Sequence, residues 1–415
     1  MFYKDILNNG LRILIEPMEN VRSITVGVWI KSGSRFESEK TQGISHLLEH
    51  MLFKGTDKMS ARDIAERVDS IGGHMNAFTS KEYTCIYLKV IDTHFDIALD
   101  ILSDMYFNSK FTEEELKKEK QVILEEIKMY EDTPDEYVHD LVLEGSYEGH
   151  ELAHNILGDR KSVNDILLDD LNDHYNTYFT ADKTVVSVSG NIDRSQAVSS
   201  IAKYFNVFKE KNSQSNDSLS IPNFKQNNIL KTKDTEQIHK CIAFSSLHVN
   251  DERLYQLNLL NNIIGGGMSS KLFQELREER GLCYAVFSYY LNFLDSGLFI
   301  IYAGVAEDNY YESCDLIWEI LNNVKNGDIT KEELERSKEQ VKGNILMGLE
   351  STSNRMARLG RDELIKEKIL TTDEIIQKID QTTENDLVKL ADDIFNKDNM
   401  SNAVIGPVSE IYQLK

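Results

Sequence analysis

The chain has 415 residues, of which 41% are hydrophobic and 9% aromatic, enough for two or three domains with cores of their own. This composition excludes a disordered chain. The formal net charge of −23 argues against a protein that binds nucleic acid through a basic surface. No basic stretch followed by an apolar segment opens the chain, and no window holds 18 uninterrupted apolar residues. We therefore expect no secretory signal and no membrane span.

The four cysteines lie far apart in the sequence and form no C-x-x-C pair. This spacing argues against both a thiolate zinc site and a disulfide framework. A reducing compartment, the cytoplasm, is the expected location.

Taken in chain order, the sequence predicts an α+β protein. Apolar runs typical of strands, over residues 24–30, 85–90 and 184–188, are separated by longer stretches with helical spacing. Residues 209–220 (KEKNSQSNDSLS) contain one apolar residue and have the composition of an exposed linker. We therefore expect an N-terminal domain over residues 1–208 and a C-terminal domain over residues 221–415.

The two halves resemble each other. The hexamer F-T-E-E-E-L from Phe111 matches I-T-K-E-E-L from Ile329, 218 residues further on, and each has a Thr suited to cap a long helix. The segment FTADKTVVSVSGN from Phe179 parallels FNKDNMSNAVIGP from Phe395 at an offset of 216. Chance similarity between short amphipathic segments is the alternative, but two matches at similar spacing favour a duplicated domain.

A candidate metal site begins in the segment GISHLLEHMLFKGT. His46 and His50 stand four residues apart, so on a helix their imidazoles project from one face and can meet one ion. Glu49 lies between them, where a carboxylate could hold a water at the metal. The order H-x-x-E-H is the inverzincin pattern.

A catalytic zinc needs a third protein ligand and one open position. Glu119 and Glu126 lie seven residues apart, two turns along one face of a predicted helix. We expect Glu126 to be the ligand and Glu119 to orient a histidine or the water. Glu125 points about 100° away from Glu126 and is the less expected ligand.

Each of these features, taken alone, also has an explanation that involves no metal. An H-x-x-E-H string is short enough to arise by chance, and a pair of histidines on a helix is more often structural than metal-binding. Glutamates on a long helix are usually solvated. Only the combination of the two histidines with the two glutamates favours a metal site.

The combined motifs resemble those of the pitrilysin or insulinase family of zinc metallopeptidases, and most closely its processing-peptidase subgroup. The resemblance rests on HLLEHMLFKGT, GGHMNAFTSKEYT, the two glutamates and LREERGLCYAVFSY, and it spans nearly the whole chain. In the family the third ligand lies 76 positions beyond the second histidine, which is where Glu126 stands relative to His50. The resemblance implies that His46, His50 and Glu126 bind one Zn²⁺ ion per chain.

The resemblance also assigns roles to the neighbouring carboxylates and to one strand. It implies that Glu49 is the general base and Glu119 the supporting carboxylate. Residues 73–79 resemble the edge strand on which the family aligns its substrate, with Asn76 and Ala77 near the scissile bond. Phe53, inside the histidine motif, is a further expected substrate contact.

Two residues of the second half match the Arg and Tyr that the family brings to the site from its C-terminal domain. Tyr284 is expected to donate a hydrogen bond to the developing oxyanion, and Arg277 to anchor the substrate main chain. Without the resemblance, both would be interpreted as ordinary residues at a helix end. The fold that it implies has two homologous domains, each a mostly antiparallel sheet covered by helices, facing each other across a cleft.

The internal repeat indicates that only the first half carries a metal site. An offset of 218 takes Glu119 to Ser337 and Glu126 to Asn344, and residues 254–280 contain no histidine pair. The second half therefore keeps the repeat pattern and lacks the ligands.

We expect a zinc-dependent endopeptidase that hydrolyses extended, unfolded peptides or presequence-like segments in an enclosed chamber. The expected assembly is a homodimer, or a heterodimer with a related chain. The negative charge suggests the hypothesis that basic peptides are preferred. The alternative is a non-catalytic subunit or assembly protein of the same fold, which metal analysis would distinguish.

Overall fold

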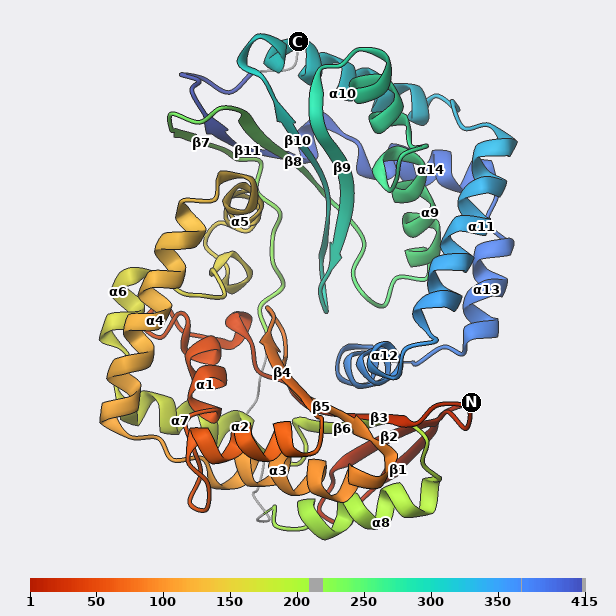
Figure 1. The fold of residues 1–415 in the computed structure, drawn as a ribbon. Helices are drawn as coiled ribbons and strands as arrows, with labels where there is room; N and C mark the ends of the chain where they lie inside the picture. Colours follow the sequence, from red (N-terminus) through yellow and green to blue (C-terminus); the bar gives the residue numbers. More distant parts are fainter. Residues whose placement is uncertain (209–218, 367, 413–415) are drawn as a thin grey trace. The chain divides into compact units, whose positions relative to one another are not determined.

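The computed structural model describes residues 1–208, 219–366 and 368–412 (Figure 1). By their contacts, the described residues divide into two compact units, each made from three stretches of the chain. Unit 1 lies within Met1–Ile127, His154–Leu219 and Met347–Ile369, and unit 2 within Lys128–Ala153, Ser220–Leu346 and Leu370–Lys415. Each unit has one sheet and its own helices, as expected for an α+β protein.

Unit 1 holds a six-stranded sheet in the order β1-β2-β6-β3-β5-β4. Its strands are β1 (Tyr3–Ile6), β2 (Arg12–Pro17), β3 (Ser23–Ile30), β4 (His74–Thr79), β5 (Thr84–Ile91) and β6 (Thr184–Gly190). Only the pair β2 and β6 is parallel. The three strands predicted from apolar runs are confirmed as β3, β5 and β6.

The helices of unit 1 lie on both faces of this sheet. They are α1 (Ile44–Leu52), α2 (Ala61–Ser70), α3 (Phe95–Asn108), most of α4 (Glu113–Glu131), α6 (Arg160–Asp165), α7 (Leu168–Tyr178), α8 (Arg194–Phe205) and α12 (Thr352–Ile365). Helices α3 and α8 cover one face and α12 the other (Figure 1). Alternate residues of β3, namely Ile24, Val26 and Val28, enter the main core because successive side chains of a strand point to opposite faces.

Unit 2 holds a five-stranded sheet in the order β7-β11-β8-β10-β9. Its strands are β7 (Asn228–Thr232), β8 (Ile238–Ser245), β9 (Cys283–Asn292), β10 (Gly297–Val305) and β11 (Met400–Gly406). Its helices are α5 (Pro134–Ser146), α9 (Leu254–Gly265), a π-helix (Phe273–Glu279), α10 (Tyr310–Lys325), most of α11 (Lys331–Gly348), α13 (Thr372–Asp380) and α14 (Glu384–Ile394). The described 3-10 turns of the chain are η1 (Ser34–Phe36), η2 (Asp92–His94), η3 (Glu151–Ala153), η5 (Glu307–Asn309) and η6 (Lys397–Asn399).

The topology confirms the predicted duplication. The order β2-β6-β3-β5-β4 in unit 1 corresponds to β7-β11-β8-β10-β9 in unit 2, and the parallel pair stands at the same place in both. Helices α4 and α11 begin 218 residues apart, and β6 and β11 begin 216 apart. The predicted caps are present, since the hydroxyl oxygens of Thr112 and Thr330 each accept a backbone N–H three residues on.

Helices α5 and α12 hold equivalent places in the repeat, yet each packs on the sheet of the other half. Helix α5 contacts β8 and β11, whereas α12 contacts β3 and β6. This finding corrects the expected continuous domains 1–208 and 221–415. An amphipathic pattern shows that a helix buries one face but not which sheet covers it. Of the predicted linker over residues 209–220, residues 209–218 lie outside the described part of the chain.

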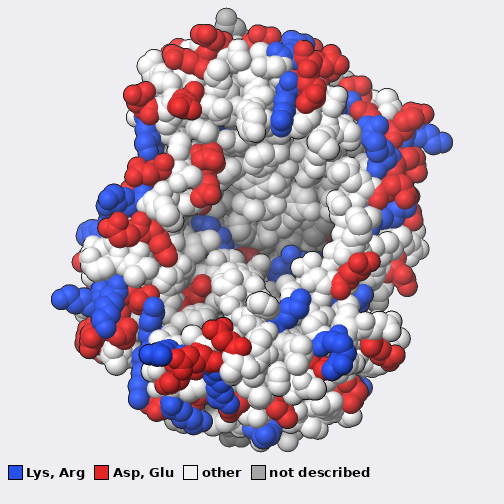
Figure 2. Space-filling model, viewed as in Figure 1, with Lys and Arg blue, Asp and Glu red and all other residues white. Residues whose placement is uncertain are grey.

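Within the described residues, no helix is both long and apolar enough to cross a lipid bilayer. On the face drawn in Figure 2, acidic side chains are spread among basic ones on each unit. The negative charge is therefore distributed over this face rather than gathered in one patch.

Candidate metal centre

Helix α1 presents the histidine motif. It begins after Gly43, whose positive φ of 90° favours glycine. Leu47, Leu48 and Met51 are buried in the core of unit 1 and anchor one side of the helix. His46 and His50 project from it with their ring centroids 4.5 Å apart. The spacing of four residues thus places both imidazoles on one face, as predicted.

Helix α4 presents the two glutamates. Leu116, Ile123 and Ile127 are buried and hold this helix against the core. The Glu119 side chain is buried, and that of Glu126 is 34% exposed. The two carboxylates lie two turns apart and both reach α1, which the sequence predicted from their spacing of seven.

Three potential ligands converge between α1 and α4. The Oε2 atom of Glu126 lies 4.0 Å from Nε2 of His46 and 3.9 Å from Nε2 of His50. One ligand atom from each of the three residues lies within 4.8 Å of the other two. Within the described chain, this is the one cluster of three or more His, Cys, Asp and Glu side chains with metal-binding geometry.

The donor set fits zinc. Two imidazole nitrogens and one carboxylate oxygen are ligands that zinc accepts at about 2.0 to 2.2 Å, so pairs of donors near 4 Å can share one ion. Burial, with a further contribution from the neighbouring His50, lowers the pKa of His46 to about 3. His46 is therefore neutral at physiological pH, with a nitrogen lone pair available to a metal.

Glu49 lies on the same helix and is held by a residue of the sheet. The Thr79 hydroxyl at the end of β4 donates a hydrogen bond to Oε2 of Glu49 across 2.5 Å. Burial raises the pKa of Glu49, and the hydrogen bond from Thr79 opposes that rise. A carboxylate with a raised pKa is suited to accept and return a proton near neutral pH. The sequence places Thr79 at the end of the expected edge strand but indicates no contact with Glu49.

Glu119 contacts the potential ligand His50 on one side and a lysine on the other. Its Oε2 atom lies 3.1 Å from Nδ1 of His50, and its Oε1 atom lies 2.7 Å from Nζ of Lys54. Lys54 belongs to the FKGT end of the histidine motif, although nothing in its spacing indicated this contact. The supporting role expected for Glu119 therefore has the required geometry.

The segment expected to align a substrate forms β4, the strand at one edge of the sheet of unit 1. Among the residues that the structure describes, it pairs only with β5, so its outer edge has no neighbouring strand there. Asn76 is exposed on this strand, and Ala77 is half-buried against the core. Phe53, which follows α1, is also half-buried against this core. Their contacts with a substrate stay predictions.

Arg277 and Tyr284 lie together in unit 2, on the π-helix and on β9 respectively. The Arg277 guanidinium lies over the Tyr284 ring, 5.1 Å from its centroid, and over the Phe273 ring at 4.8 Å. Tyr284 is 74% exposed, so its hydroxyl is available to a ligand. The metal cluster belongs to unit 1, and the expected action of this pair on a substrate stays a prediction.

The duplicated α+β fold and the His-His-Glu cluster define the class of zinc metallopeptidases. Residues 12–160 match the sequence profile described as Insulinase (Peptidase family M16), and residues 165–341 match that of the Peptidase M16 inactive domain. The chain belongs to the insulinase family, peptidase family M16. The match to an inactive domain agrees with the second half of the repeat, where Asn344 stands in place of the expected ligand Glu126 and Ser337 in place of the supporting Glu119.

Relatives of the chain include proteins named as zinc proteases. The chain is 46% identical to the zinc protease YmxG of Bacillus subtilis over 96% of this chain and 97% of that protein. It is 37% identical to the zinc protease SCO5738 of Streptomyces coelicolor over 97% of this chain and 89% of that protein. A protease from Helicobacter pylori has the same fold, with a TM-score of 0.91 and 23% identity over 98% of this chain and 99% of that chain.

Proposed function

We propose that this protein is a zinc-dependent endopeptidase that cleaves extended, unfolded peptides, with one zinc ion per chain. The observation that supports it is the convergence of His46, His50 and Glu126 beside the carboxylate of Glu49. A bound zinc ion supplies a Lewis acid that polarises a carbonyl and lowers the pKa of water. His46, His50 and Glu126 would hold that ion.

Glu49 is the proposed general base. Its carboxylate accepts a proton from the attacking water and then donates that proton to the leaving amine. The hydrogen bond from Thr79 fixes one carboxylate oxygen, so the other is left to face the water. Tyr284 is proposed to stabilise the oxyanion by donating a hydrogen bond, and Arg277 to hold the substrate main chain.

The edge strand β4 supports the proposed substrate class. A peptide added to an exposed edge gains backbone hydrogen bonds whatever its side chains are. A folded protein has few free strands to offer, so extended and unstructured segments, including presequence-like ones, are the proposed substrates. Asn76, Ala77 and Phe53 are the proposed contacts on the side of unit 1.

The proposal extends to assembly and location. We propose a homodimer, or a heterodimer with a related chain, that encloses the peptide in a chamber with a preference for basic sequences. A fully active monomer in light scattering would contradict the proposed dimer. Equal cleavage of acidic and basic peptides would contradict the proposed preference for basic sequences. Four free, buried cysteines suit a reducing cytoplasm.

Metal analysis and peptide cleavage test the core of the proposal. The purified protein should hold one equivalent of zinc and cut unstructured peptides at internal bonds that mass spectrometry identifies. Glu49→Gln should retain zinc and lose turnover. Glu125→Gln, an exposed change on α4, should alter neither. A protein without stoichiometric metal, or a Glu49→Gln variant with normal turnover, would refute the proposal.

A further inference from the structure

Residues 33–37, which precede α1, form a buried segment that contacts two parts of the proposed active site. The segment includes the 3-10 turn Ser34–Phe36 and lies between β3 and the histidine helix. Arg35 is 2% exposed and Glu37 is 3% exposed. Charged side chains are almost never this buried unless they are paired. The partners of these two residues therefore indicate what the segment does.

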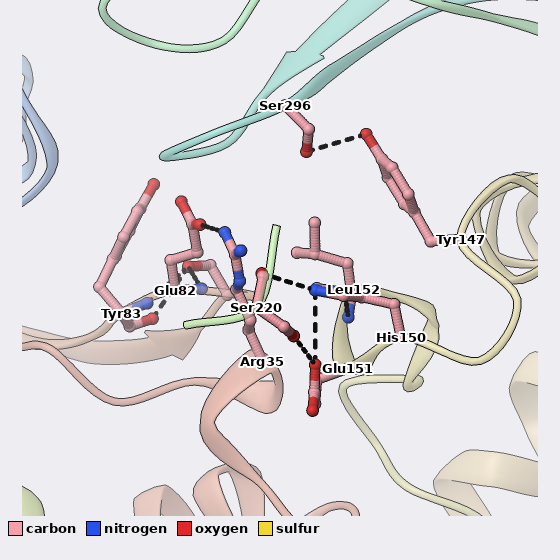
Figure 3. A network of polar contacts seen from close by, with 10 residues as sticks. Arg35, Glu82, Tyr83, Tyr147, His150, Glu151, Leu152, Ser220 and Ser296 are labelled. Atoms are coloured by element: carbon pink, nitrogen blue, oxygen red, sulfur yellow. Dashed lines mark hydrogen bonds and ion pairs between the residues drawn. The ribbon is translucent and has the colours of Figure 1, made fainter. Parts of the chain in front are cut away.

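Arg35 attaches the segment to the β4–β5 hairpin. Its guanidinium donates to Oε1 of Glu82 across 2.6 Å, and Figure 3 shows the two side chains against each other. Its backbone N–H donates to the carbonyl of Lys81 at 2.8 Å. A Cβ on Gly33 would stand 2.3 Å from the carbonyl oxygen of Ser80, so only glycine permits this approach. The backbone N–H of Ser34 donates to that same carbonyl at 3.3 Å, so three hydrogen bonds hold the turn that follows the proposed substrate strand.

Glu37 attaches the segment to the histidine helix. Its Oε2 atom accepts the N–H of Gly43 and its Oε1 atom the N–H of Ser45, both at 2.8 Å. These groups are among those that the start of a helix leaves unsatisfied, and a negative charge is favourable there. The local cap position, Gly43, has no side chain to do this. His46 follows Ser45 directly.

Helix capping alone does not explain a buried carboxylate at this place. Ser60, Asp159 and Asp193 cap α2, α6 and α8 of the same unit from exposed positions next to each helix. Burial raises the pKa of Glu37 to about 7, while the two backbone N–H groups and the charge of Lys81 oppose that rise. The chain therefore accepts an unfavourable burial at the start of the helix that carries His46 and His50.

We propose that residues 33–37 are a brace that fixes the metal helix α1 and the β4–β5 hairpin in one geometry. Glu37 is the positioning residue for His46 and His50, and Arg35 is the positioning residue for the hairpin. The hairpin part rests on the proposed function, because it treats β4 as the substrate strand. The metal part rests only on the cluster of His46, His50 and Glu126. Displacements of about 1 Å are enough to reduce catalysis strongly.

Cobalt and zinc titrations of Glu37→Gln test the metal part. The variant keeps the size of the side chain but replaces one acceptor with an N–H₂ group that faces a backbone N–H. We expect the dissociation constant for Co²⁺, followed by its visible spectrum, to rise about tenfold or more. Far-UV circular dichroism should be unchanged.

Asp193→Asn is the matched control, because Asp193 caps α8 through the N–H of Gln196 and that helix carries no ligand. It should leave the Co²⁺ dissociation constant unchanged. An unchanged constant in Glu37→Gln, or an equal rise in both variants, would overturn the metal part.

The double variant Arg35→Met with Glu82→Leu tests the hairpin part. Removing both charges avoids the unpaired buried charge that a single change would leave and that can unfold a protein. We expect unchanged Co²⁺ affinity and a KM for an unstructured peptide raised about tenfold or more, with kcat changed less. An unchanged KM in a folded double variant would overturn this part. If the wild-type protein binds Co²⁺ but cleaves no peptide, the proposed reaction is refuted. The Co²⁺ titrations that test the metal part can still be interpreted in that case.

Discussion

The Oε2 atom of Glu119 lies 3.1 Å from Nδ1 of His50, whose Nε2 atom lies 3.9 Å from Glu126. The carboxylate is placed to accept a hydrogen bond from Nδ1–H of His50, which leaves the lone pair of Nε2 free for a metal. Lys54, 2.7 Å from the other oxygen, keeps the carboxylate in this orientation. The cluster of potential ligands therefore contacts a carboxylate that does not itself belong to the cluster.

Replacing Glu119 with glutamine should weaken metal binding. The glutamine amide can present its N–H₂ group to Nδ1 of His50. It therefore does not fix the tautomer of His50 in which the lone pair of Nε2 is free for a metal. We expect the zinc dissociation constant to rise about 10- to 100-fold in competition with a chelator. Glu125→Gln, exposed on the same helix, is the control and should leave the constant unchanged. Equal affinity in both variants would show that Glu119 does not orient the histidine.

Replacing Thr79 with valine should slow turnover without removing the metal. The substitution keeps the shape of the side chain but removes the hydroxyl that donates to Glu49 at 2.5 Å. Because a misoriented base transfers protons less well, we expect kcat to fall about tenfold or more. Zinc content should not change. Thr79→Ser keeps a hydroxyl and should restore most of the rate, whereas a normal kcat in Thr79→Val would contradict the role.

The cluster of potential ligands could be predicted from the sequence because the positions of its members follow helical periodicity. His46 and His50 share a face at a spacing of four, and Glu119 and Glu126 share one at a spacing of seven. Thr79 could not be found this way. It reaches Glu49 across 30 positions of sequence and from a strand, so no periodic pattern joins the two.

The duplicated fold was predictable for a similar reason, since the two halves repeat their helix starts and their strand sequences at nearly constant offsets. The packing of α5 and α12, each on the sheet of the other half, was not predictable. Gly360 looks like an ordinary helical glycine in the sequence, and only the packing of α12 on β3 shows that it lies against Trp29. Long-range packing of this kind carries no local signature.

Gly360→Ala should therefore destabilise unit 1. A Cβ at this position would lie 2.1 Å from Nε1 of Trp29, which donates to the Ser187 hydroxyl at 2.8 Å. Helix α12 would have to move off the sheet, at a cost of about 1 to 3 kcal/mol in the free energy of unfolding. Urea unfolding followed by Trp29 fluorescence measures this in a Trp318→Phe background, because the chain has only two tryptophans.

Gly348→Ala is the control for this experiment. A Cβ there would have its nearest neighbour at 3.8 Å, so the change should alter the free energy by less than about 0.5 kcal/mol. A Gly360→Ala variant as stable as Gly348→Ala would show that α12 does not pack tightly on the first sheet in solution.

Buried His174 should make unit 1 sensitive to acid. Its Nε2 atom lies 2.9 Å from the Ser32 hydroxyl and 3.3 Å from that of Ser45, and its ring lies 4.6 Å from that of Tyr178. Burial, with a smaller contribution from the charge of Lys183, lowers the pKa of His174 to about 3. An unfolded histidine titrates at about 6.5, so only the unfolded chain gains this proton as the pH falls below that value.

His174 should therefore contribute fully to stability above pH 6.5 and progressively less from there down to about pH 3. One proton corresponds to a slope of about 1.4 kcal/mol per pH unit in the free energy of unfolding. Urea unfolding between pH 7.5 and 4.5 should show a smaller slope in the His174→Asn variant than in wild type. For His74→Asn, a change at an exposed position, the curve of unfolding free energy against pH should run parallel to that of wild type. If the curves of wild type and His174→Asn were parallel, protonation of His174 would not drive the loss, because any other group titrates equally in both proteins.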